Sequence, residues 1–153
     1  MIRVIRVLAI GLMLAGAVGL QAQGGAAKKA TTLFDRLGGQ KAIVAVVDDF
    51  VGNCAADKRI NSFFAATAAD KTRLAKFKGN LVDQICQAAG GPCKYTGKDM
   101  KAAHQGMGIG SADFDALVED LVKSLDKFKV AKADKDTLLG VLGPMKAQIV
   151  QKK

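Results

Sequence analysis

MKAAHQGMGI, residues 100–109, contains the only histidine of the chain, His104. Glycine is so frequent between residues 90 and 110 that this stretch is not expected to form one long helix, and His104 should lie on a short turn bounded by glycines. Imidazole is a common protein ligand for metal ions. A lone histidine in a helical domain is nevertheless more often a surface residue or a hydrogen-bonded core residue. The choice between these interpretations therefore depends on the residues around His104.

Outward from this turn, apolar residues recur every three or four positions, as they do on one face of a helix. The predicted apolar faces are Ile43, Val44, Val46, Val47, Phe50, Val51 and Cys54; Leu74, Phe77, Leu81, Val82, Ile85 and Cys86; Phe114, Leu117, Val118, Leu121, Leu125 and Phe128; and Leu138, Leu139, Val141, Leu142, Met145, Ile149 and Val150. The sequence therefore predicts an all-α domain with four substantial helices.

Glycine, proline and capping residues predict where these helices begin and end. The Gly-Gly-Pro at residues 90–92 should end the second helix, and Ser111 is a suitable N-cap for the third. The last helix should start at Asp134 or Asp136 and should bend or split at Gly143-Pro144.

The composition is that of a globular protein, with 50% hydrophobic and 24% charged residues. The net charge is +9, but the lysines are scattered, which favours a role in solubility. Aromatic residues make up 5% of the chain and tryptophan is absent, so a base-stacking surface is poorly supplied and no nucleic-acid partner is expected.

The N-terminal segment is typical of a secretory signal. Arg3 and Arg6 precede an uncharged apolar run over residues 7–20, and small and polar residues follow it. The run is shorter than the roughly 20 residues that span a bilayer. We expect a signal peptide over residues 1–22, a flexible leader over 23–32, and an exported, periplasmic protein. The alternative is an uncleaved signal segment, which would be the only membrane attachment.

Three cysteines are too few for a fold built on disulfides, but export permits disulfide formation. Cys86 ends the second predicted helix and Cys93 follows the Gly-Gly-Pro, so a chain reversal could join them. We hypothesise a Cys86–Cys93 disulfide and a buried Cys54. There is no Cys-x-x-Cys-His motif, so the cysteines do not indicate a covalently attached cofactor.

A series of short motifs follows in order along residues 33–150. They are LFDRLGG (33–39), AI (42–43), VVDDF (46–50), INSFF (60–64), GGP (90–92), YTGKDM (95–100), AHQGMGI (103–109), LL (138–139) and GPM (143–145). No single motif is specific, but the ordered set at this spacing resembles the group 1 truncated haemoglobins.

The resemblance implies a globin domain over residues 33–151 that folds as a two-over-two helical sandwich enclosing one b-type haem. It implies that His104 is the proximal ligand of the iron. Phe64 would pack flat against the porphyrin, and Lys76 and Tyr95 would reach the propionates. The implied haem contacts are Phe50, Phe63, Phe64, Lys76, Phe77, Leu81, Tyr95, Met100, Ile109, Phe114 and Val118.

The distal gas pocket departs from the family pattern. Members of group 1 commonly place tyrosine where this chain has Val51, and Phe77, Asn80 and Leu81 complete the expected pocket. Without the usual tyrosine and glutamine donors, oxygen should bind less tightly, because each hydrogen bond to a polarised ligand contributes about 1.5–3 kcal/mol. Asn80 is an alternative donor, and Lys76 and Lys78 are candidates for a sixth iron ligand.

The resemblance implies reversible binding of a diatomic gas: oxygen, nitric oxide or carbon monoxide. One alternative is a haem enzyme with nitric oxide dioxygenase or peroxidase-type activity that depends on an external electron-donor protein. A second is a basic helical binding module without haem. The sequence leaves the oligomeric state and the physiological ligand open.

Overall fold

The computed structural model describes residues 31–152, so the predicted signal segment and nearly all of the leader lie outside the described residues. The described residues are mainly helical. The elements are α1 (Leu33–Arg36), α2 (Gly39–Ala56), η1 (Asn61–Phe64), α3 (Ala65–Ala68), α4 (Lys71–Ala88), α5 (Met100–His104), α6 (Ser111–Lys127), α7 (Lys132–Leu142), η2 (Gly143–Met145) and α8 (Lys146–Ile149). The predicted all-α class is confirmed.

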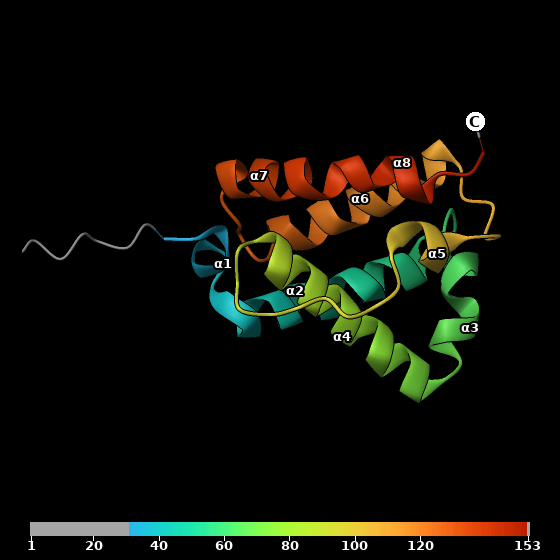
Figure 1. Ribbon diagram of the computed structural model, residues 1–153, viewed down its shortest axis with the longest axis horizontal. Coiled ribbons are helices and arrows are strands. Elements are labelled where there is room, and N and C mark those ends of the chain that lie inside the picture. The colour runs from blue at the N-terminus through green and yellow to red at the C-terminus, as the bar shows by residue number, and fades with distance from the viewer. Residues whose placement is uncertain (1–30, 153) are drawn as a thin grey trace, which may run out of the picture.

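The longer helices form two layers (Figure 1). α2 packs against both α4 and α6, while α7 contacts α4 and α8 contacts α6. Figure 1 shows α7 and α8 in line with each other above α6, with α2 and α4 in the other layer. This arrangement is the expected two-over-two sandwich, and the short α5 lies at one end of it against α8.

Two of the predicted helix boundaries are confirmed and two are wrong. α4 ends just before Gly90, and Pro144 splits the last helix into α7, η2 and α8. The N-cap of α6 is Gly110 rather than Ser111, because the Asp113 carboxylate accepts the Gly110 amide at 2.8 Å. α7 begins at Lys132, earlier than predicted, because the carbonyl of its N-cap, Ala131, already accepts helical hydrogen bonds from the amides of residues 134 and 135.

Buried side chains form two apolar clusters. The larger lies among α2, α4, α6 and α7 and includes Val47 and Leu125, which are almost fully buried. The smaller consists of Ile109, Phe114 and Ile149, with partly buried neighbours. All three come from the C-terminal third of the chain, so α6 and α8 enclose the segment that follows His104.

Three residues of the predicted apolar faces are exposed. Val44 is 41% exposed, Phe128 is 42% exposed and Val141 on α7 is 43% exposed. Val44 lies at the edge of its helical stripe, and Phe128 lies just beyond the last residue of α6. A stripe predicted from spacing alone is therefore wider than the face that the neighbouring helices cover.

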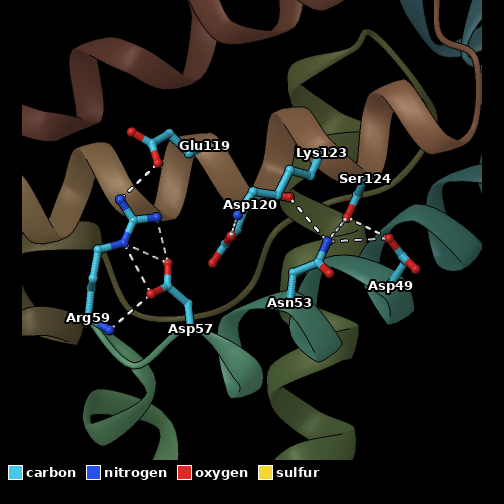
Figure 2. Close-up of polar contacts among 8 residues, drawn as sticks. All are labelled: Asp49, Asn53, Asp57, Arg59, Glu119, Asp120, Lys123 and Ser124. Carbon is cyan, nitrogen blue, oxygen red and sulfur yellow. Dashed lines mark hydrogen bonds and ion pairs between the residues drawn. The ribbon is translucent and has the colours of Figure 1, made fainter.

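Polar contacts join α2 to α6 (Figure 2). The Ser124 hydroxyl is fully buried and donates to the Asp49 carboxylate at 2.9 Å, while the Asn53 amide donates to Ser124 at 2.9 Å. Lys127 also pairs with Asp49. The hydrogen bond from Lys127 and those from Ser124 and Asn53 lower the pKa of Asp49. Charged and neutral donors thus fix the register of the two helices.

A second contact ties the end of α2 to α6. The Arg59 guanidinium lies 2.7 Å from the Asp57 carboxylate and 2.8 Å from that of Glu119, as Figure 2 shows. Asp57 is the C-cap of α2 and Glu119 lies on α6.

Between residues 31 and 152, no helix is both long enough and apolar enough to span a bilayer.

We predict that Asp49→Asn lowers the unfolding free energy by about 1–3 kcal/mol at pH 7, because a charged acceptor of buried hydrogen bonds is lost. A carboxylate whose pKa is lowered in the folded state stabilises the protein above its unfolded pKa of about 3.9, and the effect is lost as the pH falls. Urea unfolding should therefore show the difference between wild type and variant shrinking below about pH 4.

The matched control is Asp48→Asn on the same helix. Asp48 is exposed and makes a surface ion pair with Lys78, so its replacement should cost at most about 1 kcal/mol. An Asp49→Asn effect as small as that of Asp48→Asn, or as large at pH 3 as at pH 7, would contradict the assignment.

Candidate functional site

A cavity of about 390 Å³ lies between the two apolar clusters and is lined by residues from both. Its volume lies in the range of roughly 300–1,000 Å³ that is usual for cofactor and ligand sites. The structure places ten of the eleven predicted haem contacts on its wall. They are Phe50, Phe63, Phe64, Phe77, Leu81, Tyr95, Met100, Ile109, Phe114 and Val118.

His104 is the last residue of α5, and its side chain lines the cavity. Its Nδ1 lies 2.7 Å from the carbonyl oxygen of Met100. A carbonyl only accepts, so Nδ1 must carry the proton, and in the neutral ring Nε2 then has a free lone pair. This is the arrangement in which histidines bind metal ions, with one ring nitrogen donating to a backbone carbonyl and the other free to coordinate.

The chain around His104 is shaped by one cap and two glycines. The Asp99 carboxylate accepts the Ala102 amide at 2.9 Å and so starts α5. Gly106 and Gly108 then turn the chain with φ of +80° and +66°, values that favour glycine. Ile109 follows at once and is buried in the smaller cluster. The glycine-bounded turn predicted for His104 is confirmed.

The cavity fits a haem better than a metal ion held by protein ligands alone. Among residues 31–152, no group of three or more His, Cys, Asp or Glu side chains could hold a metal ion. A single imidazole facing an apolar space suits an iron that already has four nitrogen ligands from a porphyrin. The rings of Phe64 and Phe77 lie 5.8 Å apart, inclined by 47°, and form an apolar part of the wall.

Two predicted site residues lie away from the cavity wall. Val51 packs against the larger cluster instead, because it lies about 100° around α2 from the cavity-lining Phe50. Lys76 is exposed on α4, and it is its neighbour Phe77 that lines the cavity. The distal pocket observed here therefore consists of Phe77, Asn80 and Leu81 without Val51.

The other polar candidates have partners of their own. Lys78, a candidate sixth ligand, pairs with Asp48 at 2.9 Å. The Tyr95 hydroxyl lines the cavity but donates to the carbonyl oxygen of Lys98 at 2.7 Å, so its proton is not available to a propionate in this arrangement. Asn80 lines the cavity, and within residues 31–152 its side chain makes no hydrogen bond.

Sequence analysis did not assign several lining residues to the site. The Gln84 amide lies on the wall, 3.4 Å from the sulfur of Met100 and 3.1 Å from that of Met145. Met145 and Ile149 belong to the apolar face predicted for the last helix, and the signal that could have identified them was that face itself. For Gln84 the only signal was its place on α4, one turn after Asn80.

The hypothesised Cys86–Cys93 disulfide is present, with the Cα atoms 5.7 Å apart. It joins the end of α4 to the loop that leads to Tyr95. Gly91 lies between them, where a Cβ would come within 2.7 Å of the Cys86 sulfur, so a side chain would collide with the bridge. Cys54 is buried, as predicted, and burial raises the pKa of its thiol to about 12, which keeps it un-ionised.

Comparisons with known proteins agree with this site. A family model described as bacterial-like globin matches residues 32–151. The group 1 truncated hemoglobin GlbN of Mycolicibacterium paratuberculosis is 32% identical over 118 residues, which cover 77% of this chain and 83% of the relative.

Solved structures give the same result. The truncated hemoglobin of Tetrahymena pyriformis in its Fe(III) form is 30% identical, with a TM-score of 0.72, and the match covers 80% of this chain and all of that one. The 2/2 hemoglobin of a Synechococcus species, which carries covalently attached heme, is 31% identical with the same TM-score and coverage. The chain is thus a haem-binding globin. The chain belongs to the bacterial-like globin family, and within it to the group 1 truncated haemoglobins.

We predict that Cys86→Ala/Cys93→Ala lowers the unfolding free energy by about 2–3 kcal/mol, the value expected for a short disulfide loop. Urea unfolding without reductant measures the difference. Reductant should destabilise the wild type by a similar amount and leave the double variant unchanged. Equal stability of the two proteins without reductant, or three free thiols in the native wild type, would exclude a stabilising bridge.

Proposed function

We propose that the protein binds a b-type haem through Nε2 of His104 and binds a diatomic gas reversibly on the opposite side of the iron. Haem iron held by one histidine supplies an open coordination position at which such a gas binds. The protein's own residues exclude water, orient the imidazole and determine which hydrogen bonds a bound gas can accept.

One observation carries this proposal: the imidazole of His104 faces an apolar cavity with Nδ1 held by the Met100 carbonyl at 2.7 Å. That hydrogen bond fixes the tautomer and the ring orientation, and it makes Nε2 the better electron donor. A histidine serving only as a core residue would satisfy its second ring nitrogen as well. No protein partner for Nε2 occurs within residues 31–152.

The test is an absorption spectrum of the purified haem-loaded protein beside His104→Gly. We expect the variant to lose the Soret band or to shift it, and added imidazole to restore the wild-type spectrum by entering the space that the side chain leaves. The matched control is Gln105→Gly, which alters the next, exposed residue. A His104→Gly protein whose ferric and reduced spectra equal those of wild type would overturn the assignment of the ligand.

The gas-binding side should favour ligands that need little hydrogen bonding. Of the polar side chains on the wall, those of Tyr95, Gln84 and Asp113 are already engaged. The Asn80 amide and the Thr67 hydroxyl are the remaining donors. Phe77 and Leu81 offer none. Oxygen gains most from a distal donor because it becomes polarised when bound, whereas carbon monoxide gains less. We therefore propose a low affinity for oxygen relative to carbon monoxide.

We predict that Leu81→Gln slows oxygen dissociation at least tenfold, because a new hydrogen bond to a polarised ligand contributes about 1.5 kcal/mol or more. Carbon monoxide dissociation should change less. Stopped-flow displacement and flash photolysis measure the two rates. Leu81→Met has a similar volume and no donor, so it should change neither rate as much. If Leu81→Gln and Leu81→Met slow oxygen dissociation equally, hydrogen bonding is not the limiting factor.

We further propose that the protein is exported to the periplasm and receives electrons from an acidic external donor. The signal-like residues 1–22 and the Cys86–Cys93 bridge support export, because disulfides persist in oxidising compartments. Lys94, Lys98 and Lys101 support the donor proposal. They flank the cavity-lining Tyr95 and Met100, are exposed and have no carboxylate partner within residues 31–152.

A further inference from the structure

The C-terminal residues fold back over the turn that follows His104. The side chain of Gln151 forms two hydrogen bonds there. Its Nε2 donates to the carbonyl oxygen of His104 at 2.5 Å, and its Oε1 accepts the amide of Gly108 at 2.9 Å. One amide group therefore closes both ends of the turn over residues 104–108.

Backbone contacts hold Gln151 in this place. The amides of Gln151 and Lys152 both donate to the carbonyl of Ile109, at 2.8 and 3.2 Å. Ile149 is buried with Ile109 in the smaller cluster, so the chain just before Gln151 is anchored by packing as well. These contacts do not involve the side chain of Gln151, and they should survive its replacement.

The His104 turn needs support from outside because little within it fixes its shape. α5 has five residues, and so short a helix has almost no stability of its own. Gly106 and Gly108 add backbone freedom. The local bond across the turn is that from the Met107 amide to the His104 carbonyl, at 3.1 Å. Gln151 supplies the second bond to that carbonyl, which has two lone pairs.

We propose that Gln151 is a positioning residue for the proximal histidine. By holding the His104 carbonyl and the Gly108 amide, it fixes the backbone that directs the imidazole into the cavity. The length and direction of the bond from Nε2 to iron then depend on the C-terminus. This inference rests on the proposed function, in which His104 holds the haem. It requires an amide, because a carboxylate at this position cannot donate to the carbonyl.

The test uses Gln151→Ala and Gln151→Glu in the full haem-loaded protein, with Gln148→Ala as the matched control. Gln148 is an exposed residue of the same type on α8 whose side chain makes no hydrogen bond within residues 31–152. Resonance Raman of the reduced protein measures the iron–histidine stretching band, which reports the geometry of that bond. Haem transfer to an excess of apomyoglobin measures the rate of haem loss.

We expect Gln151→Ala, which loses both hydrogen bonds, to shift or broaden the iron–histidine band and to lose haem about tenfold faster. Gln151→Glu keeps an acceptor for the Gly108 amide but turns a carboxylate oxygen toward the His104 carbonyl, so it should also shift the band and lose haem faster. In the haem-loaded Gln151→Ala protein, the Gly108 amide should also exchange faster, because it has lost its acceptor. Gln148→Ala should change none of these. Circular dichroism should show the same helix content in all four proteins.

An unchanged band and an unchanged rate of haem loss in both Gln151 variants would overturn the inference. His104→Gly separates this failure from failure of the proposed function. If His104→Gly abolishes the band while the Gln151 variants leave it intact, His104 is the ligand and only the role of Gln151 is wrong. If the band persists in His104→Gly, the assignment of the ligand itself fails.

Discussion

The apolar cavity between two packed clusters is the constraint on which the rest of the structure depends. Apolar walls facing each other across an open space would close if the helices could approach, because interiors pack to high density. Here the helices are held from outside the cavity: Asn53 and Ser124 fix α2 against α6, and Ile149 fixes α8 against Ile109. A group that fills the space removes the exposed apolar surface, so haem binding and folding stability are coupled.

The apolar character of the cavity also explains why most polar atoms on its wall have hydrogen-bond partners within the protein. The Tyr95 hydroxyl is bound to a backbone carbonyl, the Gln84 amide lies against two methionine sulfurs, and Nδ1 of His104 is bound to the Met100 carbonyl. Each satisfied group avoids the cost of an unpaired polar atom in an apolar setting. The imidazole Nε2, the Asn80 amide and the Thr67 hydroxyl remain for a ligand among the residues that line the cavity. The cavity is therefore apolar in effect although several polar residues line it.

Much of this was predictable from the sequence. The helical spacing of apolar residues predicted the four main helices, and glycine and proline predicted the ends of α4 and α7. The resemblance carried by the ordered motifs pointed to His104 and to eleven haem contacts. His104 and ten of those eleven residues line one cavity. The errors have physical causes. The spacing of apolar residues does not show how much of a helical face the neighbouring helices cover, and Val44 and Phe128 are left exposed. Family correspondence does not show which way a helical side chain faces, as at Val51. Contacts between residues distant in sequence, such as Gln151 with His104, leave no local signal.

Those long-range contacts matter because the site is built on short segments. The loop before Tyr95 and the turn after His104 have little regular structure. Each is held in place by a contact with another part of the chain. The Cys86–Cys93 bridge ties the loop to α4, and Gln151 ties the turn to the end of α8. Short segments let the helices spread around a wide cavity, and external ties restore the rigidity that those segments lack. A five-residue helix can thus hold His104 toward the cavity, because the precision of the site comes from the contacts around that helix.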